Sequence, residues 1–291
     1  MIQLVLGYGH AAFTRLCIES IYRHTPPGEI NLVVWENRST DLLSTEDVNP
    51  QNTVLLRLDQ NYGCSTALNA LLKDFGAALG EDVMYLSNDH YVFPHWIDPL
   101  LENHHRLQVA SPMHPHGLPD THRRLIEFLN FRETSRQEYL DHPESRDRIR
   151  AFLHLIYGND LERIVRERIR PMPPVLCPGQ FWAGCFFVSK EILPEVGLFR
   201  TDRGLACDED AIWFEENIRR RYVSGVYSHC FIHHFQSITT NRFHLSMDHA
   251  EGEFSRGPVP PLTGAAKACI RDAVAKMGSI LSKNGNEGAD L

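Results

Sequence analysis

Short apolar runs alternate with helical patterns over the first hundred residues of the chain. The apolar runs at 2–6, 29–35, 54–58 and 82–86 predict strands. Apolar residues recur at helical spacing from Phe13 to Ile21, and again from about Ser65 to Phe75. Strands that alternate with helices imply right-handed crossovers. The pattern therefore predicts an α/β fold, with a mostly parallel central sheet and helices on both faces.

Polar clusters follow three of these strands. Residues 36–41 follow the second strand, 59–63 the third, and Ser87-Asn88-Asp89 the fourth. In open α/β sheets ligands bind beyond the carboxyl ends of the strands. We therefore expect a binding site on this edge of the sheet, with Ser87-Asn88-Asp89 in it.

Residues 114–175 have a different composition. From His122 to Arg170 there are eleven arginines and no lysine, interleaved with acids, and the spacing predicts two or three inserted helices. The segment "LERIVRERIR" places its apolar residues on one helical face, namely Leu161, Ile164, Val165 and Ile169. The pattern favours a solvated helix surface with paired charges, and an acceptor-binding role is the alternative.

The pattern after this insertion predicts a return to the sheet. We expect a connector at 171–178, a strand at 180–188, a helix from about Ser189, a longer helix at 210–221 and one or two strands at 222–237. A last helix is predicted at 265–282, followed by a disordered tail, "KNGNEGADL". The predicted organisation is one domain over 1–245 and a C-terminal extension over 246–291. Within that domain, residues 1–112 would bind the nucleotide, 114–175 would form the helical insertion, and 176–245 would carry the acceptor-binding and catalytic residues.

Composition narrows the class of protein. The chain has 291 residues, 43% of them hydrophobic, and a formal net charge of −8, which argues against a general nucleic-acid binder. No apolar run approaches the roughly 20 residues of a membrane span, and the N-terminus lacks signal-peptide features. The seven cysteines are scattered without a CxxC pair, which is typical of neither a zinc module nor a disulfide framework. We expect a cytoplasmic protein.

Several segments together resemble a known family. These are "ESIYRHTPPGEINLVVWENRSTD", "NYGCSTALNALL", "YLSNDHYVFPHW", "FWAGCFFVSKEILPEVGLF" and "DEDAIWFEENIRRRY". In this order, over about residues 2–240, they resemble family 2 glycosyltransferases, which have the nucleotide-diphospho-sugar transferase (GT-A) fold. Glu36 and Arg38 depart from the family's Asp-Asn-Gly-Ser-Thr-Asp motif, and Ser87 stands in place of the first carboxylate of the metal-binding DxD motif.

The resemblance implies a metal site. Asp89 matches the family's metal-binding carboxylate for Mn²⁺ or Mg²⁺ on a diphosphate, and the alternative is an Asp that caps a turn at a strand end. His234 is a candidate second contact to the metal or diphosphate. Because His233 and His234 point to opposite faces of a strand, at most one of them can enter the site; a structural role is the alternative for either.

The resemblance also implies residues for the donor, the acceptor and catalysis. The donor contacts would be Gly7, Tyr8, His10, Glu36, Asn37, Asn61, Gly63 and Asn88. Ordinary turns are the alternative for the glycine loops at 7–10 and 61–63, and a solvated strand-end residue is the alternative for Glu36. Trp182, Ala183 and Gly184 would line the acceptor or sugar subsite, unless Trp182 is a core residue. Asp210 is the expected general base, ahead of Glu209 and Asp208, although all of these acids also suit a helix N-terminus.

The sequence thus predicts a metal-assisted, inverting glycosyltransferase that uses a UDP- or dTDP-sugar. The acceptor stays open among a glycan, a lipid-linked or small molecule, a protein and a modified nucleic-acid base. One alternative is a nucleotidyltransferase, against which the absence of repeated glycines in "GYGHAAFTR" counts. The other is a sugar-nucleotide-binding protein without turnover, which the departure at Ser87 leaves open.

Overall fold

The structure is a computed structural model of the whole chain. It describes residues 1–7, 11–26, 28–37, 42–103, 107–113, 146–171, 176–178, 181–182, 184–202, 209–235 and 258–287. The predicted contacts Tyr8, His10, Ala183 and Asp208 lie outside these residues, as do 114–145 of the predicted insertion.

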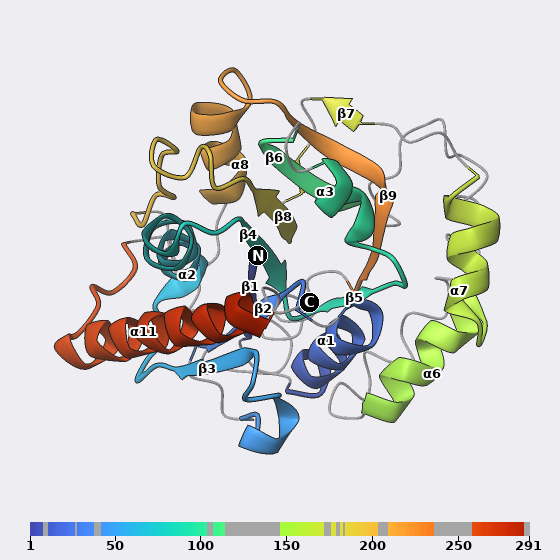
Figure 1. Cartoon of the computed structure of the whole chain (residues 1–291), viewed down its shortest axis with the longest axis horizontal. Helices are drawn as coiled ribbons and strands as arrows, with labels where there is room; N and C mark the ends of the chain where they lie inside the picture. Colours follow the sequence, from blue (N-terminus) through green and yellow to red (C-terminus); the bar gives the residue numbers. More distant parts are fainter. Residues whose placement is uncertain are drawn as a thin grey trace.

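A twisted central sheet runs through the molecule (Figure 1). Among the described residues its order is β3-β2-β1-β4-β8-β6-β9-β5, and β7 pairs with β9. Strands β1 to β4 pair in parallel, whereas β8 runs antiparallel to both β4 and β6. The strands are β1 (Ile2–Gly7), β2 (Asn31–Glu36), β3 (Thr53–Arg57), β4 (Val83–Ser87), β5 (His90–Val92), β6 (Val109–Met113), β7 (Leu176–Pro178), β8 (Cys185–Val188) and β9 (Ser224–His234).

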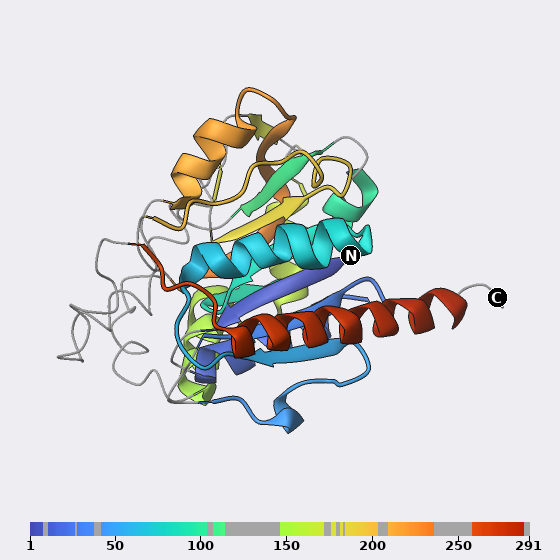
Figure 2. The ribbon, with the colours of Figure 1, turned by 90° about the vertical axis from the view of Figure 1, so that its left-hand side faces the viewer.

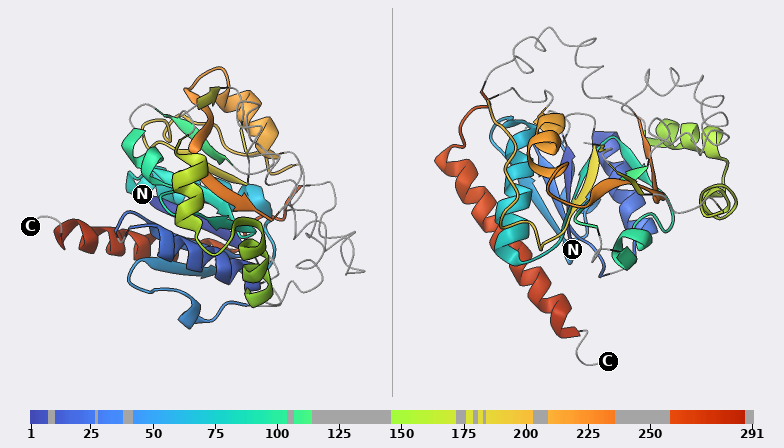
Figure 3. Two further views of the ribbon diagram at one scale, coloured as in Figure 1. Left: turned by 90° about the vertical axis from the view of Figure 1, so that its right-hand side faces the viewer. Right: turned by 90° about the horizontal axis from the view of Figure 1, so that it is seen from above.

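Helices cover both faces of this sheet (Figures 2 and 3). The helices of the described residues are α1 (Ala11–His24), η1 (Thr45–Asp47), α2 (Gly63–Ala70) with its π-helical continuation η2 (Leu71–Ala77), α3 (Asp98–Asn103), α6 (Arg146–Tyr157), α7 (Leu161–Ile164) with η5 (Val165–Ile169), α8 (Glu209–Trp213) with η6 (Phe214–Ile218), and α11 (Gly264–Glu287).

Alternate residues of the strands enter separate cores. Leu4 packs in the core that α2 and α11 cover, whereas Val5 packs in the core that α1 covers. Burial on both faces explains why these strands appear in the sequence as nearly continuous apolar runs. The predicted fold class, a mostly parallel sheet with helices on both faces, is confirmed.

The arginine-rich helices have the paired charges that the sequence favours. Glu19 of α1 accepts from Arg150 at 2.6 Å and from Arg23 at 2.7 Å, and Arg170 lies 3.8 Å from Asp98. The apolar residues predicted to share one face of 161–170 pack together, with Ile164, Val165 and Ile169 buried.

Some predicted boundaries are wrong. The helix predicted from Ser189 is a series of turns over 190–195, because Pro194 has no N–H to continue a helix. The strand predicted at 180–188 begins only at Cys185. The predicted disordered tail begins too early: α11 continues to Glu287, and Asn284 in its last turns donates to Asn31 Oδ1 at 3.0 Å. Among the described residues, no helix combines the length and apolarity that a membrane crossing requires.

Candidate metal and nucleotide site

The polar ends of the parallel strands lie along one edge of the sheet. Gly7 pairs with Glu36, Glu36 with Arg57, and Leu6 with Ser87. The antiparallel β8 begins at this same edge, where the Ser87 amide donates to the Gly184 carbonyl at 2.8 Å. The segments expected to surround a donor are therefore neighbours, as the position of the strand ends predicts.

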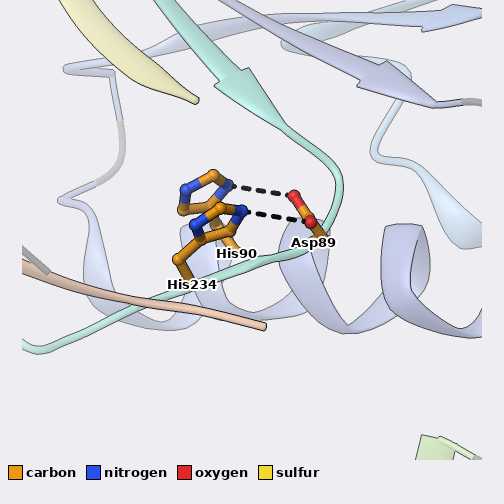
Figure 4. A group of neighbouring side chains, drawn as sticks. All are labelled: Asp89, His90 and His234. Atoms are coloured by element: carbon orange, nitrogen blue, oxygen red, sulfur yellow. Dashed lines mark hydrogen bonds and ion pairs between the residues drawn. The ribbon is translucent and has the colours of Figure 1, made fainter. Parts of the chain in front are cut away.

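Asp89 lies at the centre of a compact polar group just beyond β4 (Figure 4). The Ser87 hydroxyl donates to Asp89 Oδ1 at 2.5 Å, and His234 Nε2 lies 3.2 Å from Oδ2. His90 Nδ1 lies 3.5 Å from Oδ1. Asp89 is almost fully buried, so its carboxylate depends on these polar neighbours.

Strand pairing brings the two histidines together. In the antiparallel pair β5–β9, His90 lies opposite His234, so both side chains are on one face. Their rings stack at 4.3 Å between centroids, with planes 6° apart. His233 points to the other face, where the Tyr157 hydroxyl hydrogen-bonds to its Nδ1 at 2.7 Å. As expected, His234 faces Asp89 and the adjacent His233 does not.

Electrostatics keep this carboxylate ionised. Burial opposes ionisation of Asp89, but His234, through charge and a hydrogen bond, and the Ser87 hydroxyl outweigh it and hold the pKa of Asp89 well below its usual range. Burial lowers the pKa of His90 to about 3, with a further contribution from His234. His90 is therefore a neutral ring at physiological pH, while Asp89 carries a negative charge.

Asp89, His90 and His234 form a group that could hold a metal ion. One ligand atom from each lies within 4.8 Å of the others. Carboxylate oxygen combined with imidazole nitrogen fits a divalent transition-metal ion better than Mg²⁺, whose preferred ligands are oxygens. The chemistry of these ligand atoms therefore fits the metal-assisted site that the sequence predicts.

Gly184 makes room for the ring of His90. A Cβ on residue 184 would stand 2.8 Å from His90 Cε1 and 3.2 Å from Nε2, closer than such atoms normally approach. Its described contacts are thus with the Asp89 group, whereas the resemblance implies a position in the acceptor or sugar subsite.

Glu36 is engaged on both carboxylate oxygens. Oε1 accepts from the Leu43 amide at 2.8 Å, and Oε2 accepts from Arg57 Nε at 2.6 Å. Arg57 also donates to the Leu43 carbonyl oxygen. Glu36 is buried while Arg57 is 42% exposed, so the guanidinium is the more accessible member of this pair. Recognition of a base by Glu36 itself stays a prediction.

The two asparagines expected at the donor lie against each other. Asn37 Nδ2 donates to Asn61 Oδ1 at 2.6 Å, and Asn37 Oδ1 accepts from the Tyr62 amide at 3.0 Å. Gly63 has φ 75°, a left-handed conformation that favours glycine, and its amide donates to Asn61 Oδ1 at 2.9 Å. These contacts fix the turn between β3 and α2.

The remaining predicted residues have well-defined neighbours. Asn88 Nδ2 donates to Thr14 of α1 at 2.9 Å, and Gly7 Cα faces the same threonine, since a Cβ there would lie 3.4 Å from Thr14 Oγ1. The backbone N–H and carbonyl of Trp182 both hydrogen-bond to Ser111 Oγ, and its side chain packs against the core that includes residues of α6. Asp210, near the start of α8, accepts from the Ala211 amide at 2.6 Å, and Glu209 is the first residue of that helix.

His90 is the member of this group that the sequence did not predict. Its signal was present, because a histidine directly follows the strand-end Asp89. That β5 would place it opposite His234 could not be known without the register between segments far apart in the chain.

No protein-family model matches the chain, and no curated protein matches it. Similar solved structures include the mannosyltransferase PcManGT from Pyrobaculum calidifontis in complex with GDP-Man and Mn²⁺ (TM-score 0.49, 14% identity, 98% of this chain and 74% of that chain covered). They also include S. aureus TarS 1-349 (0.47, 13%, 99% and 91%). A third is glucosyl-3-phosphoglycerate synthase from Mycobacterium tuberculosis in complex with Mn²⁺, uridine-diphosphate and phosphoglyceric acid (0.43, 14%, 97% and 78%). At TM-scores below 0.5 these likenesses assign no function to this chain.

Proposed function

We propose that this protein is a glycosyltransferase of the GT-A type, which transfers a sugar from a UDP- or dTDP-sugar to an acceptor with inversion at C1. The observation that carries the proposal is the pairing of an ionised, buried Asp89 with His234 at the carboxyl end of β4. A carboxylate and an imidazole at this place suit a divalent metal on a diphosphate, because phosphate oxygens and water supply the other ligands.

The proposed metal ligands are Asp89 and His234. When bound there, Mn²⁺ would neutralise negative charge that develops on the departing diphosphate. Asn37, Asn61 and Gly63 hold the strand-end turns that would contact the nucleotide, and Arg57 presents the accessible charge beside them. Trp182 stays the proposed acceptor-side residue.

Asp210 is the proposed general base. The acceptor oxygen forms a bond to C1 as the bond from C1 to the diphosphate oxygen breaks, and the acceptor's proton passes to the carboxylate. A position near the start of α8 favours the ionised form that can take this proton.

Thermal stabilisation tests the donor site. A ligand of the folded state raises the melting temperature, by an amount equivalent to about 2.7 kcal/mol at a hundredfold excess over its dissociation constant. We expect UDP or dTDP to stabilise the protein in the presence of Mn²⁺, and EDTA or Asp89→Asn to remove the effect. Asp74→Asn, on η2, is the matched control that should respond like wild type. No response to any nucleoside diphosphate would overturn the donor site.

Turnover separates transfer from binding alone. The donor tested is the nucleotide-sugar whose nucleoside diphosphate stabilises the protein. With Mn²⁺ we expect slow release of nucleoside diphosphate from this donor, because water can replace the acceptor. Asp210→Asn should reduce the release by at least about tenfold while leaving nucleotide stabilisation intact. Stabilisation without release from any nucleotide-sugar would favour the sugar-nucleotide-binding protein instead.

A further inference from the structure

The hydrogen bonds of His90 determine which ring nitrogen carries its proton. Nδ1 lies 3.0 Å from the Ser87 carbonyl oxygen and 2.9 Å from Ser87 Oγ. A carbonyl oxygen can only accept, so Nδ1 is the protonated nitrogen and donates. A ring nitrogen that carries a proton has no lone pair for a metal. Nδ1 is also the nitrogen on the Asp89 side, 3.5 Å from Oδ1.

The other nitrogen of His90 faces a different way. Each ring in Figure 4 turns one nitrogen toward Asp89 and the other away from it. The edge of the His90 ring that carries Nε2 lies against Gly184, where a Cβ would be 3.2 Å from Nε2. The lone pair of His90 is therefore directed away from the carboxylate with which it would have to share a metal.

His90 instead supports the groups around it. Its ring, 2% exposed, lies flat on that of His234, which is 21% exposed. Ser87 joins His90 to Asp89, because its Oγ accepts from Nδ1 while its proton goes to Oδ1. An aspartate at 87 could accept from His90 but could not donate to Asp89. This explains a serine where the resembled motif has a carboxylate.

We propose that His90 is a positioning residue and not a metal ligand: it orients His234 by stacking and Asp89 through Ser87, so that two members of this group, Asp89 and His234, bind the metal. This inference rests on the proposed function, because it concerns the same metal site. Mutation of a residue that supports a metal ligand typically weakens metal affinity by roughly ten- to hundredfold, although that residue does not touch the ion.

Pulsed electron paramagnetic resonance of the full chain with Mn²⁺ and UDP tests this directly, because coupling to ¹⁴N counts the bound imidazoles. We expect one coupled imidazole in the wild type, none in His234→Ala and one in His90→Asn. Asparagine keeps an N–H near the position of Nδ1 but lacks the ring that stacks on His234. His90→Asn should therefore weaken Mn²⁺ binding by about tenfold. His90→Gln, whose amide reaches the position of Nε2, should lose the bond to Ser87 and bind Mn²⁺ more weakly still.

The wild-type count decides even if a variant does not fold. Two coupled imidazoles in the wild type, or loss of one in His90→Asn, would overturn this inference and leave the proposed function intact. Wild-type protein that binds no Mn²⁺ with any nucleotide would overturn the metal site and the inference together.

Discussion

Arg57 donates to Glu36 at 2.6 Å from the neighbouring strand, and this joins a half-exposed guanidinium to a buried carboxylate. Both residues also hydrogen-bond to the backbone of Leu43: Glu36 accepts from its amide, and Arg57 donates to its carbonyl oxygen. A charge-assisted contact to a buried acid is stronger than a surface ion pair, because removing one partner leaves a charge without compensation. The loop after β2 is therefore attached to β3 at the edge where the donor is proposed to bind.

We expect Arg57→Ala to lower the free energy of unfolding by roughly 2–3 kcal/mol. The matched control is Arg219→Ala, which removes an ion pair to Glu215 in which both side chains are about half exposed, and which should cost less than about 1 kcal/mol. Urea unfolding of both variants measures the difference. Equal losses in the two variants would contradict a special role for the Arg57–Glu36 pair.

The glycine beside His90 gives a second prediction. Gly184→Ala places a Cβ 2.8 Å from His90 Cε1, so the ring must shift and its contacts with Ser87 and His234 must weaken. We expect a lower melting temperature and Mn²⁺ affinity reduced by about tenfold or more. Gly264→Ala is the control, since nothing lies within 4 Å of a Cβ there, and it should leave the melting temperature and the Mn²⁺ affinity close to those of wild type. Unchanged Mn²⁺ affinity in Gly184→Ala would show that the site tolerates the shift.

Local pattern was enough to predict strands β1 to β4 of this site, because buried parallel strands leave continuous apolar runs, but it did not predict β5. The polar residues that follow β4 led to the prediction of a binding edge, and the family resemblance singled out Asp89 there; binding of a metal by Asp89 stays a prediction. His90 and the partners of Glu36 could not be predicted in this way. Both depend on register: β5 against β9 places His90 opposite His234, and β2 against β3 places Arg57 beside Glu36. Register between distant segments is set by packing that no local pattern contains.

The predicted end of the last helix was wrong because long-range contacts override local preference there. Glycine and asparagine in "KNGNEGADL" disfavour helix, yet α11 continues to Glu287 because its earlier turns are anchored on the sheet. Ala266, Ile270, Ala273, Met277 and Ile280 of this helix belong to the same core as Leu4.

A core role for α11 leads to a third prediction. Met277 is fully buried, so Met277→Ala should cost about 2–5 kcal/mol through the cavity it leaves. Lys283→Ala, on an exposed position of the same helix, should change stability by less than about 0.5 kcal/mol. A single cooperative urea transition in both variants, monitored by tryptophan fluorescence and circular dichroism, would show that α11 unfolds with the sheet. A separate early transition of α11 would contradict this.

The contact between Tyr157 and His233 connects the arginine-rich helices to the strand that carries His234. The hydroxyl of Tyr157 reaches His233 Nδ1 at 2.7 Å within a buried aromatic cluster. Tyr157→Phe keeps the ring and removes the hydroxyl that makes this hydrogen bond, so we expect a loss of about 1–3 kcal/mol in unfolding free energy. Because His233 and His234 are adjacent in β9, local loosening should also accelerate hydrogen exchange of the backbone amides of β9 relative to those of β1. Exchange rates unchanged across β9, together with wild-type stability, would mean that the helices dock without restraining this strand.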